Sequence, residues 1–193
     1  MDAHHYLLAH FRGARLRRQV FNTPADRSVQ PARRIGRMSG QELRALMSRV
    51  PSSVAVVTVD TNGQRLGLTV GSLVALSLEP PLVAVVISRQ AATHELLREA
   101  GGFAVSILAA GQEWLAQHFA RGVPPIAMWR GIATEAGASG APLLAGALGW
   151  LECRLRDELP VGTHTLFVGD VLCVQLGEDA PPLLRSRGDY ASK

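Results

Sequence analysis

Small, hydroxyl-bearing and glycine residues concentrate in one stretch between two apolar segments. The stretch begins with Thr69-Val70-Gly71-Ser72 and continues to Ser77, which stands before the double proline Pro80-Pro81. Gly71 lacks a Cβ, so the backbone there can approach a flat ligand, and the neighbouring hydroxyls can hydrogen-bond the edges of that ligand. These residue types favour a cradle for a flat cofactor over a catalytic triad. A strand end with a glycine bulge is the alternative.

A second polar group, Ser88, Arg89 and Thr93, follows the apolar run 82–87. The pattern predicts a helix that begins at Thr93, and the free amides and positive dipole of a helix N-terminus favour an anion. Arg89 can add a bidentate contact to a phosphate group. We therefore predict a phosphate site here. The alternative is that Thr93 only caps the helix and that Arg89 is a solvated charge.

The residue inventory excludes several other kinds of site. The only lysine is Lys193, which excludes a Walker-A lysine and a lysine Schiff base. No Gly-x-Gly-x-x-Gly is present, so a Rossmann site is not expected. The two cysteines have no histidines at zinc-ligand spacing, and we expect no metal site. His94 and His118 are interpreted as surface or satisfied edge residues, and no residue order points to hydrolysis.

Cys153 and Cys173 lie in two apolar segments that pattern as adjacent antiparallel strands. With the turn centred near residues 160–162, Cys153 would face position 168 and Cys173 would face position 148. That separation is too great for a disulfide. We therefore expect two buried free thiols.

Charge is distributed unevenly along the 193 residues. Residues 1–37 hold eight arginines and two aspartates, a net charge of +6, whereas residues 38–193 carry −2. We therefore expect a basic, flexible N-terminal arm over residues 1–38 and one domain over residues 39–193, with Met38 as an alternative start. Nucleic-acid binding through the arm is a weaker alternative, because the domain itself is slightly acidic.

The apolar content of 47% is sufficient for a single sizeable core. No apolar run is long enough to span a bilayer, and the N-terminus lacks the apolar region of a signal peptide. We therefore expect a cytoplasmic protein without membrane association.

Local patterns predict many short strands and few helices. Ser39 and Glu42 form a capping box that begins an amphipathic helix, and Pro51 ends it. We expect strands over 54–60, 66–70, 82–88 and 103–108, helices over 93–100 and 111–120, and a long hairpin over 145–156 and 164–175. These elements favour a mostly β fold with short helices, a closed or split barrel, over a parallel α/β sheet.

Taken in chain order, these segments resemble the flavin reductase-like family. The resemblance covers residues 43 to 190. It rests on the order of several short motifs, among them Gly67-Leu68-Thr69-Val70-Gly71-Ser72, Ser77-Leu78-Glu79-Pro80-Pro81, Gly162-Thr163-His164 and the tail 185–190. It implies a Greek-key split β-barrel that binds FMN, assembled as a homodimer.

The resemblance also implies roles for individual residues. It places His164 beside the flavin and the nicotinamide as a positioning group, although Thr163 stands where the family often has aspartate. It places Ser77 at the ribityl chain or as a turn cap. Phe103 is expected either to back the flavin ring or to pack in the core, and Tyr190 to border the nicotinamide pocket.

The activity implied by the resemblance is that of an NAD(P)H:flavin oxidoreductase. NADH or NADPH would pass a hydride to N5 of FMN or FAD, and the reduced flavin would diffuse to a separate flavin-dependent monooxygenase. The alternative is a flavin- or haem-binding split-barrel protein that serves as a carrier or sensor without turnover. The sequence leaves open which flavin, which nicotinamide and which oxygenase are used.

Overall fold

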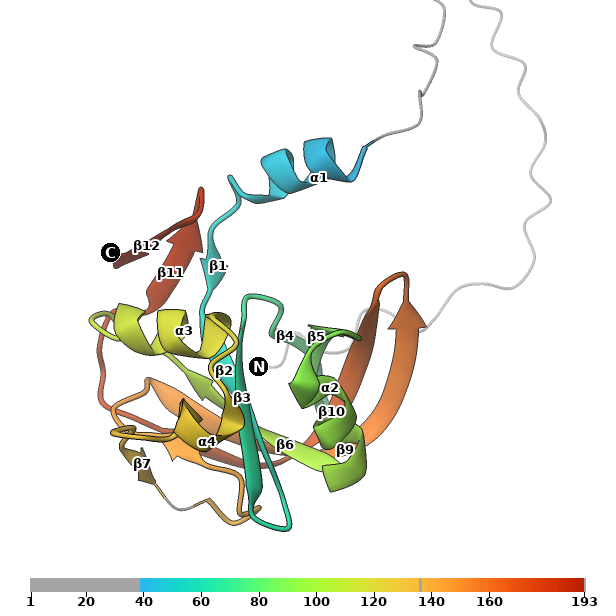
Figure 1. Ribbon diagram of the computed structural model, residues 1–193, viewed down its shortest axis with the longest axis vertical. Helices are drawn as coiled ribbons and strands as arrows, with labels where there is room; N and C mark the ends of the chain where they lie inside the picture. The colour runs from blue at the N-terminus through green and yellow to red at the C-terminus, as the bar shows by residue number, and fades with distance from the viewer. Residues whose placement is uncertain (1–38, 136, 193) are drawn as a thin grey trace, which may run out of the picture. The chain divides into compact units, whose positions relative to one another are not determined.

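The computed structural model describes residues 39–135 and 137–192, so the predicted arm over residues 1–38 lies outside the described residues. Strands dominate the described part (Figure 1), which confirms the prediction of a mostly β fold. Its helices are short: α1 (Gly40–Met47), α2 (Ala92–Ala100), α3 (Glu113–Ala120) and α4 (Pro125–Met128). Within the described ranges, no helix has both the length and the apolar character of a membrane span.

The main sheet is antiparallel and has seven strands, in the order β3-β2-β6-β9-β10-β5-β4. Its strands are β2 (Ala55–Thr61), β3 (Gln64–Val70), β4 (Val74–Leu78), β5 (Pro81–Ser88), β6 (Gly102–Ile107), β9 (Gly149–Val161) and β10 (His164–Leu176). A second sheet pairs β1 (Ser52–Ser53), β11 (Leu183–Ser186) and β12 (Asp189–Ser192), and β7 (Thr134–Glu135) pairs with β8 (Leu143–Leu144).

Aromatic side chains fill the core between the main sheet and the helices, with Phe103, Phe119 and Phe167 almost fully buried. Gly67 is required by this packing, because a Cβ at Gly67 would lie 2.6 Å from the ring of Phe119 on α3. The hydroxyl of Thr69 donates to the carbonyl of Ala116 at 2.7 Å. The glycine-rich stretch therefore also fastens α3 to β3.

The predicted pairing of the two cysteines is wrong. The β9–β10 turn lies at residues 162–163, later than predicted, and the ladder shifts register twice. Cys153 therefore faces Val171, and Cys173 faces Glu152. Both thiols are free, as predicted, but only Cys153 is buried. Burial raises the pKa of the Cys153 thiol to about 12, so this thiol is unreactive at neutral pH.

The edge strands of the main sheet, β3 and β4, do not pair with each other. A serine in the segment that connects them makes hydrogen bonds to β5 instead. Ser72, in the β3–β4 connection, accepts a hydrogen bond from the Val86 amide at 3.0 Å and donates to the Val86 carbonyl at 3.1 Å. Val86 lies on β5, beyond the last pair that β5 forms with β4. The serine hydroxyl therefore satisfies backbone groups that no strand reaches, and it holds the connection against β5.

We predict that Ser72→Ala lowers the free energy of unfolding by about 1–3 kcal/mol, because it leaves both Val86 backbone groups without a protein partner. Ser77→Ala is the matched control, since within the described ranges the Ser77 hydroxyl makes no hydrogen bond; its expected effect stays within about 0.5 kcal/mol. Urea denaturation measures both variants. Equal stability of Ser72→Ala and wild type would contradict the assigned role.

Candidate functional site

The predicted cradle offers mainly its backbone to a ligand. The hydroxyl proton of Thr69 is already donated to Ala116, so its oxygen can only accept further bonds. The Val70 side chain is buried in the core. Gly71 is exposed, and a Cβ there would lie 2.9 Å from the Ser52 hydroxyl. The Gly71 backbone is therefore open to solvent, and the approach of a flat ligand to it stays a prediction.

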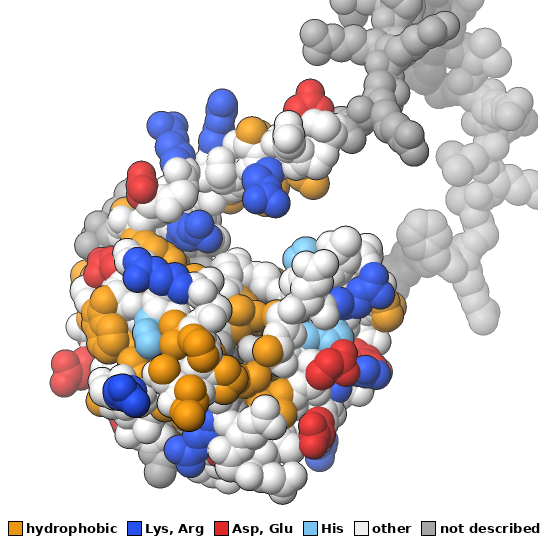
Figure 2. Space-filling view, in the orientation of Figure 1, with side chains coloured by type: hydrophobic (Ala, Val, Ile, Leu, Met, Phe, Trp, Pro, Cys, Tyr) orange, Lys and Arg blue, Asp and Glu red, His pale blue; other side chains and the backbone are white. Residues whose placement is uncertain are grey.

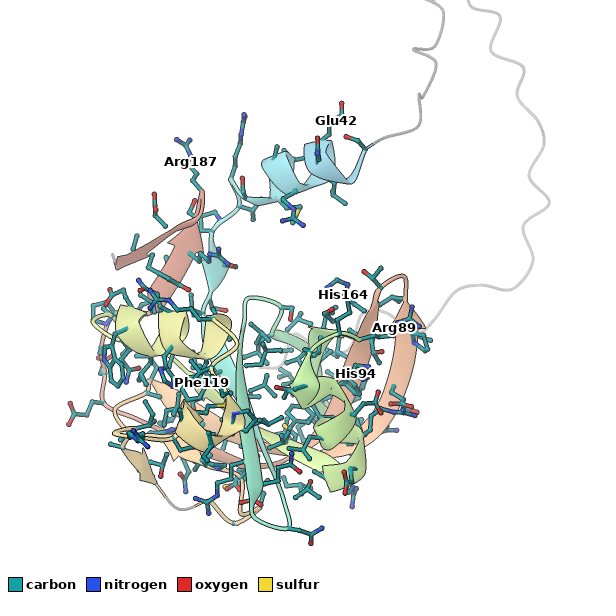
Figure 3. All side chains as sticks on the ribbon, in the orientation of Figure 1. Glu42, Arg89, His94, Phe119, His164 and Arg187 are labelled. Atoms are coloured by element: carbon teal, nitrogen blue, oxygen red, sulfur yellow. The ribbon has the colours of Figure 1, made fainter. Side chains whose placement is uncertain are left out.

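The end of the β9–β10 hairpin and the end of β5 meet in one group of polar residues, here called the hairpin-end cluster: Ser88, Arg89, Gly162, Thr163 and His164. Ser88 faces His164 directly in the ladder. The Arg89 guanidinium donates to the Gly162 carbonyl at 2.8 Å, and the Arg89 amide donates to the Thr163 carbonyl at 3.1 Å. Two segments 73 residues apart in sequence thus present one arginine and one histidine side by side (Figure 3).

His164 is exposed at the start of β10. Its Nδ1 lies 2.9 Å from the Thr163 hydroxyl, and this contact orients the imidazole. A threonine hydroxyl can donate to or accept from Nδ1, whereas an aspartate could only accept. Thr163 therefore supplies the orienting contact without fixing one tautomer of the ring.

The predicted start of α2 is wrong by one residue, and Thr93 does not cap it. Ala91 is the N-cap, and no side chain bonds the first turn. The Thr93 side chain is only 3% exposed and is turned into the core. An anion at this end of α2 would therefore meet backbone amides, together with Ser88 and Arg89 before the helix.

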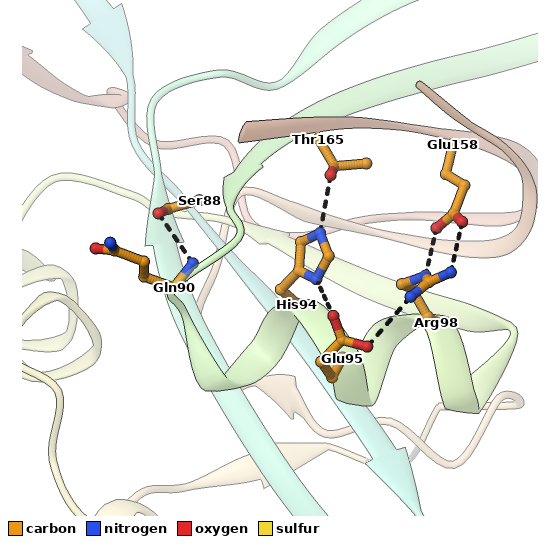
Figure 4. A network of polar contacts seen from close by, with 7 residues as sticks. All are labelled: Ser88, Gln90, His94, Glu95, Arg98, Glu158 and Thr165. Carbon is orange, nitrogen blue, oxygen red and sulfur yellow. Dashed lines mark hydrogen bonds and ion pairs between the residues drawn. The ribbon is translucent and has the colours of Figure 1, made fainter. Parts of the chain in front are cut away.

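A buried histidine on α2 connects this helix to β10 through a polar network (Figure 4). His94, on α2, places its Nε2 2.8 Å from the Thr165 hydroxyl and its Nδ1 2.8 Å from the Glu95 carboxylate. Arg98 continues the network to Glu95 and to Glu158 on β9. His94 is thus a satisfied structural residue, as interpreted from sequence, and it links α2 to the strand that carries His164.

Three of the predicted contact residues lie elsewhere. Phe103 is fully buried, so it packs in the core and offers no surface to a ligand. Tyr190 belongs to the separate β1-β11-β12 sheet, where the Arg185 guanidinium lies 5.8 Å from the centre of its ring. Ser77 lies half-buried on β4, opposite Leu82. The structure therefore does not bring these three side chains into the hairpin-end cluster.

Two neighbouring cavities share two lining residues, and the smaller one lies at the cradle. The smaller, of about 90 Å³, is lined by Thr69, Val70 and Gly71 together with Ser52, Val54, Ala120 and Arg185. The larger, of about 660 Å³, shares Ser52 and Arg185 with it. The larger cavity lies between α1 and the turn after β11, and no residue of the β9–β10 hairpin lines either cavity. Figure 2 shows a separate open hollow between α1 and the hairpin end, and Figure 1 places the β3–β4 connection between β1 and β5.

A flavin fits this arrangement on the open surface but not inside the small cavity, whose 90 Å³ is far below the roughly 300–1,000 Å³ of a small-molecule site. The cradle and the hairpin-end cluster are close together, because Ser72 bonds to Val86 and Val86 lies two residues, about 7 Å along a strand, before Ser88. The exposed backbone at Gly71 can support a flat ring, and Arg89 can bind a phosphate group.

Sequence reasoning missed Ser52 and Arg185, which line both cavities. The signal available was charge: Arg44, Arg185 and Arg187 are basic residues in a domain whose net charge is slightly negative. Over residues 39–135 and 137–192, no group of three or more His, Cys, Asp or Glu residues could hold a metal ion.

Comparison with known proteins agrees with this geometry. A family model described as "Flavin reductase like domain" matches residues 47–193. The reductase component of 4-hydroxyphenylacetate 3-monooxygenase from Thermus thermophilus is 39% identical over 78% of this chain and 94% of its own. An NADH-dependent FMN reductase from Streptomyces nodosus subsp. asukaensis is 38% identical, over 86% and 88%.

A solved structure supports the same conclusion. The NADH:FAD oxidoreductase SgcE6 of Streptomyces globisporus, in complex with NAD and FAD fragments, is 36% identical and covers 78% of this chain and 90% of its own, with a TM-score of 0.74. The predicted split-barrel fold is thereby confirmed. The chain belongs to the flavin reductase-like family.

Proposed function

We propose that this protein is a flavin reductase that takes reducing equivalents from reduced pyridine nucleotide and supplies reduced flavin to a separate monooxygenase. The observation that carries the proposal is the position of the hairpin-end cluster next to the exposed backbone of Gly71, held there by the Ser72–Val86 hydrogen bonds. A bound flavin supplies the ring that accepts the hydride. Similar proteins named as monooxygenase reductase components support the link to a partner oxygenase.

The residues of this chain bind and orient rather than perform acid–base chemistry. Arg89 and the amides at the start of α2 hold a phosphate group, and His164 lies exposed where a nicotinamide can approach. The chain lacks a lysine clamp, which favours modest affinity and release of the reduced flavin. The homologues include reductases named for FMN and for FAD, and we propose that either flavin is accepted. Since reduced pyridine nucleotides are kept inside cells, we propose a cytoplasmic site of action.

We expect the purified protein to oxidise NADH or NADPH in the presence of added FMN or FAD, because hydride transfer needs only the two ring systems held together. The decrease in nicotinamide absorbance measures this oxidation, and omission of flavin is the control. Flavin that stays bound without nicotinamide oxidation would instead favour a carrier or sensor. No flavin-dependent oxidation with either donor would refute the proposed activity.

Arg89→Gln should raise the KM for FMN about tenfold and leave the KM for riboflavin nearly unchanged, because only FMN carries the phosphate. Initial rates with both flavins measure the two constants. Arg89 also holds the hairpin turn through Gly162, and loss of that contact would impair both flavins equally. Arg130→Gln, an exposed arginine outside the cluster, is the matched control. Equal effects on FMN and riboflavin would show that Arg89 does not bind the phosphate.

We further propose a homodimer that covers the apolar face of α1. Leu43, Leu46, Met47 and Val50 recur at helical spacing, each is 52–59% exposed, and α1 has no buried residue. An isolated helix of eight residues is only marginally stable in water, so this face favours burial against another surface. A second copy of the chain offers the same face and can bury both at once.

Light scattering after size-exclusion chromatography should give the mass of two chains for wild type. Leu46→Glu should shift the protein toward the mass of one chain, since it places a charge in the apolar face. Gln41→Glu, on the polar side of the same helix, should leave the dimer intact. A wild-type protein with the mass of one chain at micromolar concentration would contradict the dimer.

A further inference from the structure

Helix α2 packs mainly on one half of the main sheet, and polar side chains connect it to the other half. Its backbone lies closest to β2, β3 and β6. The β9–β10 hairpin, which carries His164, belongs to the other half. Within residues 39–135 and 137–192, only His94 and Arg98 of α2 form hydrogen bonds with this hairpin. The position of α2 relative to the hairpin therefore depends on two side chains.

These two connections differ in their burial. Arg98 forms its ion pair with Glu158 at the surface, where water screens the attraction, so the pair constrains the helix weakly. His94 lies in the first turn of α2 and is only 4% exposed, and its Nε2 is 2.8 Å from the hydroxyl of the equally buried Thr165. A buried polar contact is costly to lose. The contact between His94 and Thr165 therefore fixes the first turn of α2 against β10.

The imidazole of His94 is held in one orientation by its neighbours. Its Nδ1 faces the Glu95 carboxylate, which can only accept, so Nδ1 carries the ring proton. In the neutral ring Nε2 then accepts the hydroxyl proton of Thr165. The ring of Phe167 packs edge-on at 5.1 Å between ring centres. A polar contact on either side and an aromatic contact leave the ring little freedom to turn.

The contact joins two parts of the candidate site. On the helix side, α2 has no side-chain cap, so its first amides stay free, and the Ser88 hydroxyl accepts only from the Gln90 amide before the helix. On the strand side, Thr165 directly follows His164, and the two side chains point to opposite faces of β10. Figure 4 shows the Ser88–Gln90 contact before the helix and the His94–Thr165 contact in its first turn.

We propose that His94 is a positioning residue of the candidate site, which acts through Thr165 to hold the amides at the start of α2 where they meet the phosphate group of a bound flavin. The inference rests on the proposed function, in which these amides bind that phosphate. His94 itself touches no ligand. Without its contact to Thr165, the strand ladder still keeps Ser88 opposite His164, whereas the first turn of α2 loses its fixed place. Binding of the phosphate then weakens, and binding of the flavin ring does not.

Thr165→Val tests this role, because it removes the hydroxyl and keeps the branched shape that suits a strand. Quenching of flavin fluorescence measures the dissociation constants of FMN and riboflavin without turnover. Thr165→Val should weaken FMN binding about tenfold and change riboflavin binding by less than about twofold, because riboflavin has no phosphate. Thr165→Ser keeps the hydroxyl and should bind FMN as wild type does.

A second pair of variants tests the contact from the helix side. His94→Leu removes it and should show the same selective loss for FMN, whereas His94→Gln keeps a side-chain amide for the Thr165 hydroxyl and should retain most of the affinity. Thr58→Val is the matched control. The Thr58 hydroxyl is equally buried and donates to the Pro142 carbonyl at 2.7 Å, outside the candidate site. Its loss should lower the midpoint of urea denaturation and leave both flavin affinities unchanged.

Several results would overturn the proposal. Unchanged FMN affinity in either Thr165→Val or His94→Leu would show that the contact does not position the helix amides. Equal losses for FMN and riboflavin, or a loss for FMN in Thr58→Val, would reflect only general damage to the fold. Wild type that binds FMN no more tightly than riboflavin would remove the phosphate site itself. The expected binding pattern in a protein that oxidises neither NADH nor NADPH would refute the reductase activity and leave the role of His94 intact.

Discussion

The pair of hydrogen bonds between the Ser72 hydroxyl and the Val86 backbone is the constraint on which the site depends. The main sheet has two free edges, and a continuous ladder does not join them. A single hydroxyl that both donates and accepts satisfies the amide and the carbonyl of one residue and holds the β3–β4 connection against β5. The exposed glycine at 71 and the polar end of β5 are neighbours for this reason.

Several hydroxyl groups near the candidate site form hydrogen bonds within the protein and so stabilise the fold. Thr69 fastens α3, Ser72 joins the sheet edges, and Thr165 satisfies the buried His94. The groups left for a bound molecule are backbone amides, the exposed imidazole of His164 and arginine side chains. Under the proposed function, such a surface would orient a flat ring and a phosphate without strong clamps, as release of the reduced flavin requires.

Six arginines of the domain form two groups that differ in their partners. Arg98, Arg154 and Arg156 pair with carboxylates on neighbouring elements and stabilise the β9–β10 hairpin and its contact with α2. Arg44, Arg185 and Arg187 have no such partners among the described residues and surround one cavity. The net charge of the domain does not reveal these two groups. Carboxylates balance the charge of the paired arginines, whereas the other three arginines line a single cavity.

Much of the fold follows from local patterns in the sequence. The capping box at Ser39, the hairpin turn at Asn62-Gly63, the glycine at the end of α2 and the apolar strands were predictable, because each depends on residues near one another in the chain. The order of motifs also identified the family. Register was less predictable: the β9–β10 turn lies later in the chain than predicted, and one irregularity between Val168 and Gly169 shifts the ladder before the Cys153–Val171 pair. Alternation of side chains does not reveal a bulge.

The sequence by itself determined the mostly β architecture, the absence of lysine-based phosphate chemistry and the candidate residues at 69–72, 88–89 and 164. Only the tertiary structure decided that Phe103 and Thr93 are buried, that Tyr190 belongs to another sheet, and that three arginines from two distant segments share a cavity. The physical reason is that composition and periodicity report neighbours within a few residues. A binding surface is made by segments that long-range hydrogen bonds and core packing bring together.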